Sequence, residues 1–169
     1  GGKQALAPIL SPLFPSLSRR VYREPFLGGG AMFFHLRPRQ AVLSDALADL
    51  IVTYEVVRDE PDALLRKLER LEGEHSDERF YEVRERFNAG RGRPSRDRGE
   101  RARERAAWLL YLNRTCYNGL FRTNQSGEFN VPVGRYRDPR IADAERIHAA
   151  SEALAGATIR HAPFDAALA

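Results

Sequence analysis

Apolar residues along this chain follow two spacings, and the changes between them divide the sequence into strands and helices. Short apolar runs at 20–23 and 41–44 are separated by three glycines and a helical turn or two over 31–36. This order predicts a strand–helix–strand unit, and therefore a parallel sheet. A further strand is expected over 157–161, and another helix from Phe164.

Between these strands apolar residues recur every three or four positions, which predicts amphipathic helices. Helices are expected from about Asp49, around Phe80, and over 100–113 and 141–154. Another helix is expected to begin at Pro61, since proline is favoured in the first turn of a helix. The residues that align on the first three helix faces are Leu50, Ile51, Tyr54 and Val57; Leu64, Leu68 and Leu71; and Phe80, Val83 and Phe87.

Two segments break the helical pattern. The segment 88–99 is rich in glycine and arginine and has no apolar residue beyond Ala89, so a loop is expected. The segment 120–136 is predicted to be an extended β-hairpin with its turn at 125–127. The predicted fold class is therefore α/β, with a core interrupted by a mostly helical insert that contains a β-hairpin.

Composition narrows the class of protein. A chain of 169 residues with 43% hydrophobic residues is long enough for one globular domain with a real core. No apolar run approaches the ~20 residues that span a bilayer, and no basic head precedes an apolar run at the start. Cys116 is the single cysteine, which excludes an internal disulfide and a cysteine metal cluster. We expect a cytoplasmic monomer with no metal and no membrane segment.

Positive charge is concentrated in one part of the chain. The formal net charge is +4, and almost all of the cations are arginines, a bias that a G+C-rich genome also produces. The stretch from Arg79 to Arg105 nevertheless holds ten arginines against five acidic residues. Localised positive charge is what a nucleic-acid partner requires.

A glycine loop and an acidic residue mark a candidate ligand site. Gly28, Gly29 and Gly30 follow the first predicted strand, where they allow positive φ and a close backbone approach to a ligand. Asp45 ends the next strand, which is where α/β nucleotide-binding folds place the acid that binds ribose hydroxyls. A plain tight turn explains the glycines alone, but the pairing with Asp45 favours a nucleoside site.

The segment 113–136 mixes amides, aromatic residues, arginines and glycines. It is too polar for a core and too aromatic for an ordinary solvent loop. Such a surface can stack on bases and read their edges. Together with the glycine loop, the segment indicates an enzyme that modifies DNA.

Taken together, the motifs resemble the DNA adenine methyltransferase family, whose members methylate the exocyclic amine of adenine in DNA. The resemblance covers nearly the whole chain. The motifs that carry it are Gly1-Gly2-Lys3, Glu24-Pro25-Phe26-Leu27-Gly28-Gly29-Gly30-Ala31, Leu43-Ser44-Asp45, Leu50-Ile51-x-x-Tyr54, the stretches 81–88 and 111–120, and Gly127-x-Phe129-Asn130-Val131-Pro132-x-Gly134-Arg135-Tyr136.

The resemblance implies a Rossmann-like methyltransferase core that binds S-adenosyl-L-methionine as methyl donor. Lys3 would lie near the donor's carboxylate and Asp45 at its ribose, and Phe164 would border its adenine. The implied donor-binding residues are Lys3, Phe26, Gly28, Gly30, Asp45 and Phe164.

The resemblance also implies double-stranded DNA as partner, with the target adenine flipped out of the helix. Tyr117 and Asn118 would lie at the base stack, Arg122 would bind a guanine edge, and Arg135 would contact phosphate. Other roles stay open: a core aromatic for Tyr117, a turn for Asn118, a phosphate anchor for Arg122 and a solvated side chain for Arg135. The implied DNA-binding residues are Tyr117, Asn118, Arg122, Asn124, Pro132 and Arg135.

The sequence departs from the family in one important respect. The family's catalytic signature, Asp-Pro-Pro followed by an aromatic residue, is absent, and Asp138-Pro139-Arg140 lies in the wrong place to replace it. We therefore assign no catalytic residue and expect that these 169 residues alone do not methylate DNA. Two smaller departures are Ala46 after the ribose acid and Pro163 before Phe164.

The predicted organisation has three parts. Residues 1–52 would form the donor-binding part of the core, residues 53–138 the target-recognition insert, and residues 139–169 the return to the core, ending before the catalytic strand. The alternative is a non-catalytic DNA-binding module, or a split methyltransferase that another chain completes. A restriction-modification system is one setting, and the host could be a bacterium, an archaeon or a phage.

Overall fold

The computed structural model describes residues 4–17, 20–90 and 99–167. A three-stranded parallel sheet lies at one end of the molecule. The strands, in spatial order, are β1 (Tyr22–Glu24), β2 (Ala41–Asp45) and β3 (Ala157–His161). The register pairs Glu24 with Leu43 and Asp45 with His161, so the three carboxyl ends lie at one edge. Asp45 therefore lies between the loops that follow the two outer strands.

The predicted strand–helix–strand unit is confirmed, with α2 (Ala31–Leu36) joining β1 to β2. Gly30 and Arg37 flank α2 and both have left-handed backbone, which limits the helix to less than two turns. Phe33 is fully buried and anchors α2 in the core that the sheet shares. β1 begins at Tyr22 because the first ladder bond runs from its N–H to the carbonyl of Gln40.

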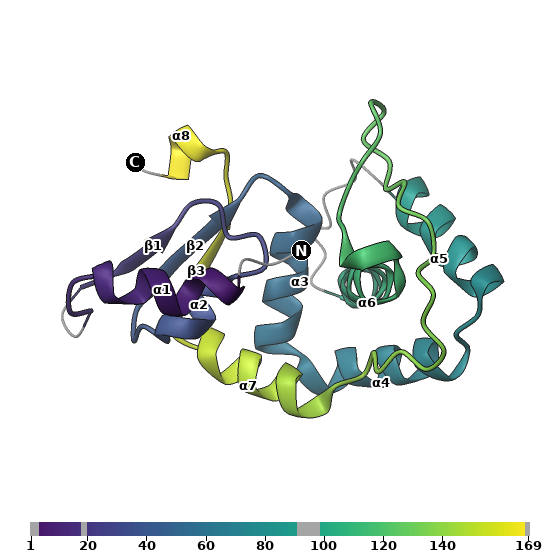
Figure 1. Ribbon diagram of the computed structural model, residues 1–169, viewed down its shortest axis with the longest axis horizontal. Coiled ribbons are helices and arrows are strands. Elements are labelled where there is room, and N and C mark those ends of the chain that lie inside the picture. The colour runs from purple at the N-terminus through teal and green to yellow at the C-terminus, as the bar shows by residue number, and fades with distance from the viewer. Residues whose placement is uncertain (1–3, 18–19, 91–98, 168–169) are drawn as a thin grey trace.

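Four α-helices follow β2 in succession: α3 (Ala48–Asp59), α4 (Pro61–Gly73), α5 (Asp77–Ala89) and α6 (Glu100–Thr115). Their apolar faces are buried where the sequence pattern predicts, as for Leu64, Leu68 and Leu71 of α4. Figure 1 shows α6 almost end-on, with α3, α4 and α5 around it, and the sheet on the far side of α3.

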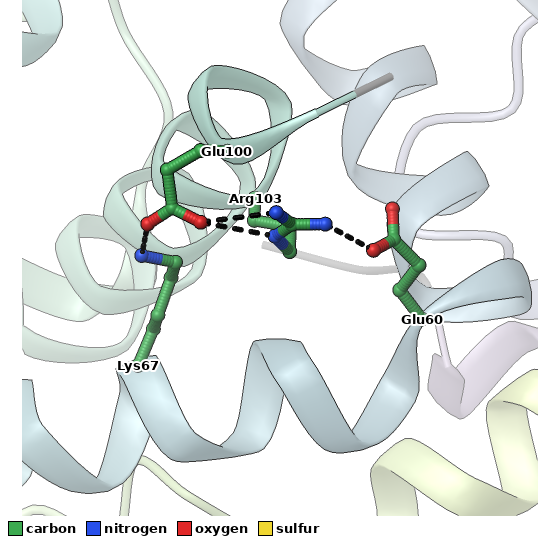
Figure 2. A network of polar contacts seen from close by, with 4 residues as sticks. All are labelled: Glu60, Lys67, Glu100 and Arg103. Carbon is green, nitrogen blue, oxygen red and sulfur yellow. Dashed lines mark hydrogen bonds and ion pairs between the residues drawn. The ribbon is translucent and has the colours of Figure 1, made fainter.

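Polar contacts reinforce this packing at the surface. Arg103 of α6 contacts Glu60, the residue that precedes α4, and also Glu100 in its own helix. Lys67 of α4 contacts the other oxygen of Glu100, so that one network joins the two helices (Figure 2).

The segment after α6 folds back on itself without forming strands. The 3-10 helix η3 (Tyr117–Gly119) is followed by isolated antiparallel bridges that pair Cys116 with Val133 and Thr123 with Phe129. The turn spans 124–127, one residue earlier than predicted. The predicted hairpin is therefore present only as bridges, and Pro132, which has no N–H, interrupts any longer ladder.

The chain then returns to the sheet through α7 (Ala144–Leu154), β3 and the short α8 (Phe164–Ala167). α7 begins three residues after its predicted start because the Asp143 side chain caps it, accepting a hydrogen bond from the Arg146 N–H. The sequence pattern also missed three short N-terminal elements, which are η1 (Gln4–Leu6), α1 (Ala7–Leu10) and η2 (Ser11–Leu13).

The boundary predicted after residue 52 falls inside a continuous helix, since α3 runs from Ala48 to Asp59. The division of the chain into three parts remains a prediction. Most of the arginine-rich loop predicted over 88–99 lies outside the described residues. Among the described residues, no helix combines the length and apolar character needed to cross a membrane.

Candidate functional site

The glycine loop is hydrogen-bonded directly to Asp45, the acidic residue at the end of β2. Gly28 donates its N–H to Oδ2 of Asp45 at 2.9 Å, and Leu47 donates its N–H to Oδ1 at 2.9 Å. The carboxylate thus closes the loop after β1 onto the loop after β2. Because a carboxylate offers about four lone-pair sites, two remain for an external donor.

The backbone of this loop requires glycine at two positions. Gly28 and Gly30 have φ of 48° and 62°, in the left-handed region that other residues rarely adopt. A Cβ added to Gly28 would meet no atom within 4 Å, whereas one added to Gly30 would lie 2.9 Å from the Phe34 ring. Gly28 therefore faces open space and Gly30 faces the protein interior.

Two exposed aromatic residues meet beside Asp45. Phe26 from the glycine loop and Phe164 from the start of α8 stack with ring centroids 4.7 Å apart and planes inclined by 12°. Their exposures are 69% and 47%, so both rings remain accessible at the surface. The pair offers a flat apolar surface next to a carboxylate.

Two residues to which the sequence analysis gave no part in a binding site also belong to this edge. Glu24 ends β1 and accepts a hydrogen bond from the Tyr22 hydroxyl at 2.9 Å, and its burial raises the pKa of its carboxyl group. Tyr54 of α3 donates its hydroxyl to the carbonyl of Gly28 at 2.9 Å. Both residues stand in motifs quoted above, Glu24 at the start of the glycine-loop motif and Tyr54 at the end of Leu50-Ile51-x-x-Tyr54. Lys3 lies outside the described residues.

A second exposed surface follows α6. Tyr117 is 54% exposed, so it is not a core aromatic. Asn118 has a left-handed backbone with φ of 53°, and Arg122 and Arg135 are exposed. Within the described residues, Arg122 uses its Nε, which donates to Asn130 Oδ1 at 3.1 Å.

The other two predicted DNA-binding residues have structural contacts inside this loop. Asn124 binds Glu128 twice, accepting from its N–H and donating to its carboxylate, both at 2.9 Å. Pro132 is exposed and accepts a hydrogen bond from the Tyr117 N–H at 2.9 Å. Asn124 therefore shapes the turn, and Pro132 holds Tyr117 in place.

Amide side chains fasten this surface to the helices, which the sequence analysis did not predict. Asn88, at the end of α5, donates to the carbonyl of Phe129 at 3.1 Å and accepts from the Phe129 N–H at 2.9 Å. Asn113 of α6 donates to the carbonyl of Gly119 at 3.0 Å. Phe129 is buried, so the Asn88 clamp fixes the loop at its root.

The described residues contain no group of histidine, cysteine, aspartate and glutamate side chains that could hold a metal ion. The chain is thus an α/β protein with a parallel sheet whose carboxyl edge carries the glycine loop and Asp45.

Comparison with known proteins gives the family. The whole chain, residues 1–169, matches the family model of D12 class N6 adenine-specific DNA methyltransferases, and the chain belongs to this family. Over 160 residues it is 39% identical to the type II methyltransferase M1.LlaDCHI of Lactococcus lactis subsp. cremoris, which covers 95% of this chain and 54% of that protein.

Two other relatives have similar identity to the chain. The type II methyltransferase M.MjaIII of Methanocaldococcus jannaschii is 37% identical over 157 residues, which cover 86% of this chain and 52% of that protein. The DNA adenine methylase of Escherichia coli K12 is 36% identical over 149 residues, which cover 84% of this chain and 50% of that protein. The chain thus spans about half the length of these curated relatives.

Proposed function

We propose that the chain is the donor-binding and target-recognition part of an enzyme that transfers a methyl group from S-adenosyl-L-methionine to the exocyclic amine of adenine in DNA. The hydrogen bond from the Gly28 N–H to Asp45 carries this proposal, because it unites the glycine loop and the acid at the carboxyl edge of the sheet. Open α/β sheets bind nucleosides at this edge. Family membership supports adenine in DNA as the target.

The residues at the edge fit the parts of the donor. The remaining lone pairs of Asp45 can accept ribose hydroxyls, and the open space beside Gly28 leaves room for the ligand to approach the backbone. Phe26 and Phe164 offer an aromatic surface for adenine. Glu24 adds a second carboxyl group, which can face the positively charged groups in the methionine part of the donor.

The reaction asks two things of this part of the enzyme. When bound, S-adenosyl-L-methionine would supply a methyl group on a positively charged sulfur: the amine nitrogen would bond to the methyl carbon as the carbon–sulfur bond breaks, a neutral thioether would leave, and the methylated amine would lose a proton. The adenine must first leave the base stack, at an expense of a few kcal/mol that protein contacts offset. Tyr117 is an exposed aromatic residue that can fill the space left in the stack. The proposed division of labour is therefore donor binding at Asp45 and base extrusion at Tyr117.

Replacing Asp45 with asparagine is expected to weaken binding of S-adenosyl-L-methionine by roughly 10–150-fold. The reason is the loss of hydrogen bonds to a charged acceptor, which contribute about 1.5–3 kcal/mol. Isothermal titration calorimetry of the full chain with the donor measures the change. Asp62→Asn is the matched control, since Asp62 is an exposed aspartate of α4 that pairs with His148.

Three outcomes of this titration are informative. Loss at Asp45 with no loss at Asp62 supports the proposed site, and equal affinity in all three proteins contradicts it. A wild-type chain that binds DNA but not the donor would favour the non-catalytic DNA-binding module over a methyltransferase part.

Two arginines of the second surface are expected to differ in their effect on DNA binding. Arg122 is held through its Nε by Asn130, which leaves its terminal nitrogens for a bidentate contact with guanine. Arg122→Ala should therefore reduce affinity for a preferred duplex by about 1–3 kcal/mol and relax sequence preference. Arg135→Ala should weaken binding to every duplex and lower the salt dependence by about one charge.

Fluorescence anisotropy over a range of salt concentrations tests both variants. The probes are a duplex selected from a random-sequence library and a scrambled duplex of the same composition. If Arg122→Ala weakens the two duplexes equally, Arg122 anchors phosphate and does not read bases.

A further inference from the structure

We infer that Tyr54 is a positioning residue for the methyl donor. Its hydroxyl would fix the glycine loop by donating a hydrogen bond to the carbonyl of Gly28. The inference rests on the proposed function of the Gly28–Asp45 edge. It extends the site to α3, a helix to which neither the sequence analysis nor the comparisons give a ligand-binding role.

The geometry around Gly28 carries this inference. Both polar groups of Gly28 are held by side chains: its N–H donates to Asp45 at 2.9 Å, and its carbonyl accepts from Tyr54 at 2.9 Å. The Tyr54 hydroxyl would also lie 3.0 Å from a Cβ on Gly30, so it lies against the inner side of the turn. One hydroxyl therefore lies beside both glycines of this loop that have a left-handed backbone.

Tyr54 is well placed for this task because the rest of its side chain is fixed. Its ring is buried in the core and stacks near Phe34 of α2, with centroids 6.3 Å apart. Burial, followed by the negative charges of Glu24 and Asp45, raises the pKa of its hydroxyl, so the group remains a proton donor. The helix α3 thus presents a rigid hydrogen-bond donor to a loop that would otherwise be held from one side.

The side of Gly28 that faces a ligand is different. An added Cβ there meets no atom within 4 Å, whereas the carbonyl is occupied by Tyr54. Tyr54 therefore acts on a ligand through Gly28 and not by contact. Without the hydroxyl, the Gly28 carbonyl loses this partner, and the loop that presents the Asp45-bonded N–H is held less firmly.

Tyr54→Phe tests this role with little change in packing, because the ring remains. We expect the Kd for S-adenosyl-L-methionine to rise roughly 3–10-fold, the effect of one lost hydrogen bond on the bound geometry. Tyr111→Phe is the matched control. Tyr111 is also buried, and its hydroxyl contacts His75 Nδ1 at 2.8 Å in the helical part of the molecule. Its removal should lower the melting temperature at least as much and leave the Kd unchanged.

A spectroscopic measurement on the ligand-free chain separates positioning from general stability. In spectra of chain labelled with ¹⁵N-glycine, Tyr54→Phe should shift or broaden the amide signals of Gly28 and Gly30, and Tyr111→Phe should leave them in place. Calorimetry of both variants then gives donor affinity. Signals and Kd that change equally in the two variants would overturn the inference. A wild-type chain that shows no donor binding would overturn the proposed function, while the glycine signals would still report whether Tyr54 holds the loop.

Discussion

Asp49→Asn is expected to lower the free energy of unfolding by about 3–5 kcal/mol. Asp49, in the first turn of α3, binds Arg105 of α6 through both oxygens, at 2.6 and 2.7 Å. Arg105 is only 4% exposed, and its remaining terminal nitrogen donates to the carbonyl of Phe87. An asparagine cannot accept both bonds, so a buried guanidinium would lose its counter-charge. Urea unfolding followed by circular dichroism measures the loss.

The matched control removes the carboxylate partner of another arginine in α6. Glu60→Gln deprives Arg103 of one partner, but Arg103 keeps Glu100 in the network of Figure 2. This network lies at the surface, where ion pairs contribute little because water and salt screen them. We expect a much smaller change for Glu60→Gln, and equal losses in the two variants would show that burial of Arg105 is not the source of the effect.

The Asp49–Arg105 pair is an example of a contact that the sequence does not predict. The strand–helix–strand unit and the helix faces were predictable because they depend on neighbours within a few positions, as Leu64, Leu68 and Leu71 do. Asp49 and Arg105 are 56 positions apart and each looks like a solvated residue of an amphipathic helix. Nothing in either local pattern indicates that a buried arginine of α6 meets a partly buried aspartate of α3.

The candidate donor site was predictable to a similar extent. Asp45 and the glycines could be placed together because carboxyl ends of parallel strands share an edge. The stack of Phe26 on Phe164 depends on two loops whose paths no periodicity describes. Tyr54 was assigned to a buried helix face, which is correct for its ring, but that pattern says nothing of its hydroxyl.

The second surface was predicted in outline and not in detail. The composition of 113–136 indicated an exposed aromatic and polar segment, and Tyr117 is indeed exposed. The hairpin was predicted from an extended segment with a turn at 125–127, which does not account for the missing N–H of Pro132. The clamp between Asn88 and Phe129 spans 41 positions and substitutes side-chain hydrogen bonds for a strand partner.

The second large effect on stability is expected at Gly30. Gly30→Ala should lower the free energy of unfolding by about 2–4 kcal/mol, because a left-handed alanine is strained and its Cβ would press on Phe34. Gly28→Ala has the same kind of backbone but open space around it, so we expect a loss of about 1–2 kcal/mol. Gly73→Ala, at the end of α4, has neither problem and should be neutral or slightly stabilising.

The three glycine variants separate strain from crowding when they are compared by urea unfolding and donor titration. Gly28→Ala should weaken donor binding more than its modest loss of stability accounts for, because the added methyl group enters the open space beside Asp45. Gly30→Ala should reduce both quantities, because its methyl group displaces Phe34 and the hydroxyl of Tyr54 from beneath the loop. Equal unfolding free energies for Gly28→Ala and Gly30→Ala would show that Phe34 yields without resistance, and that backbone strain alone explains the need for glycine.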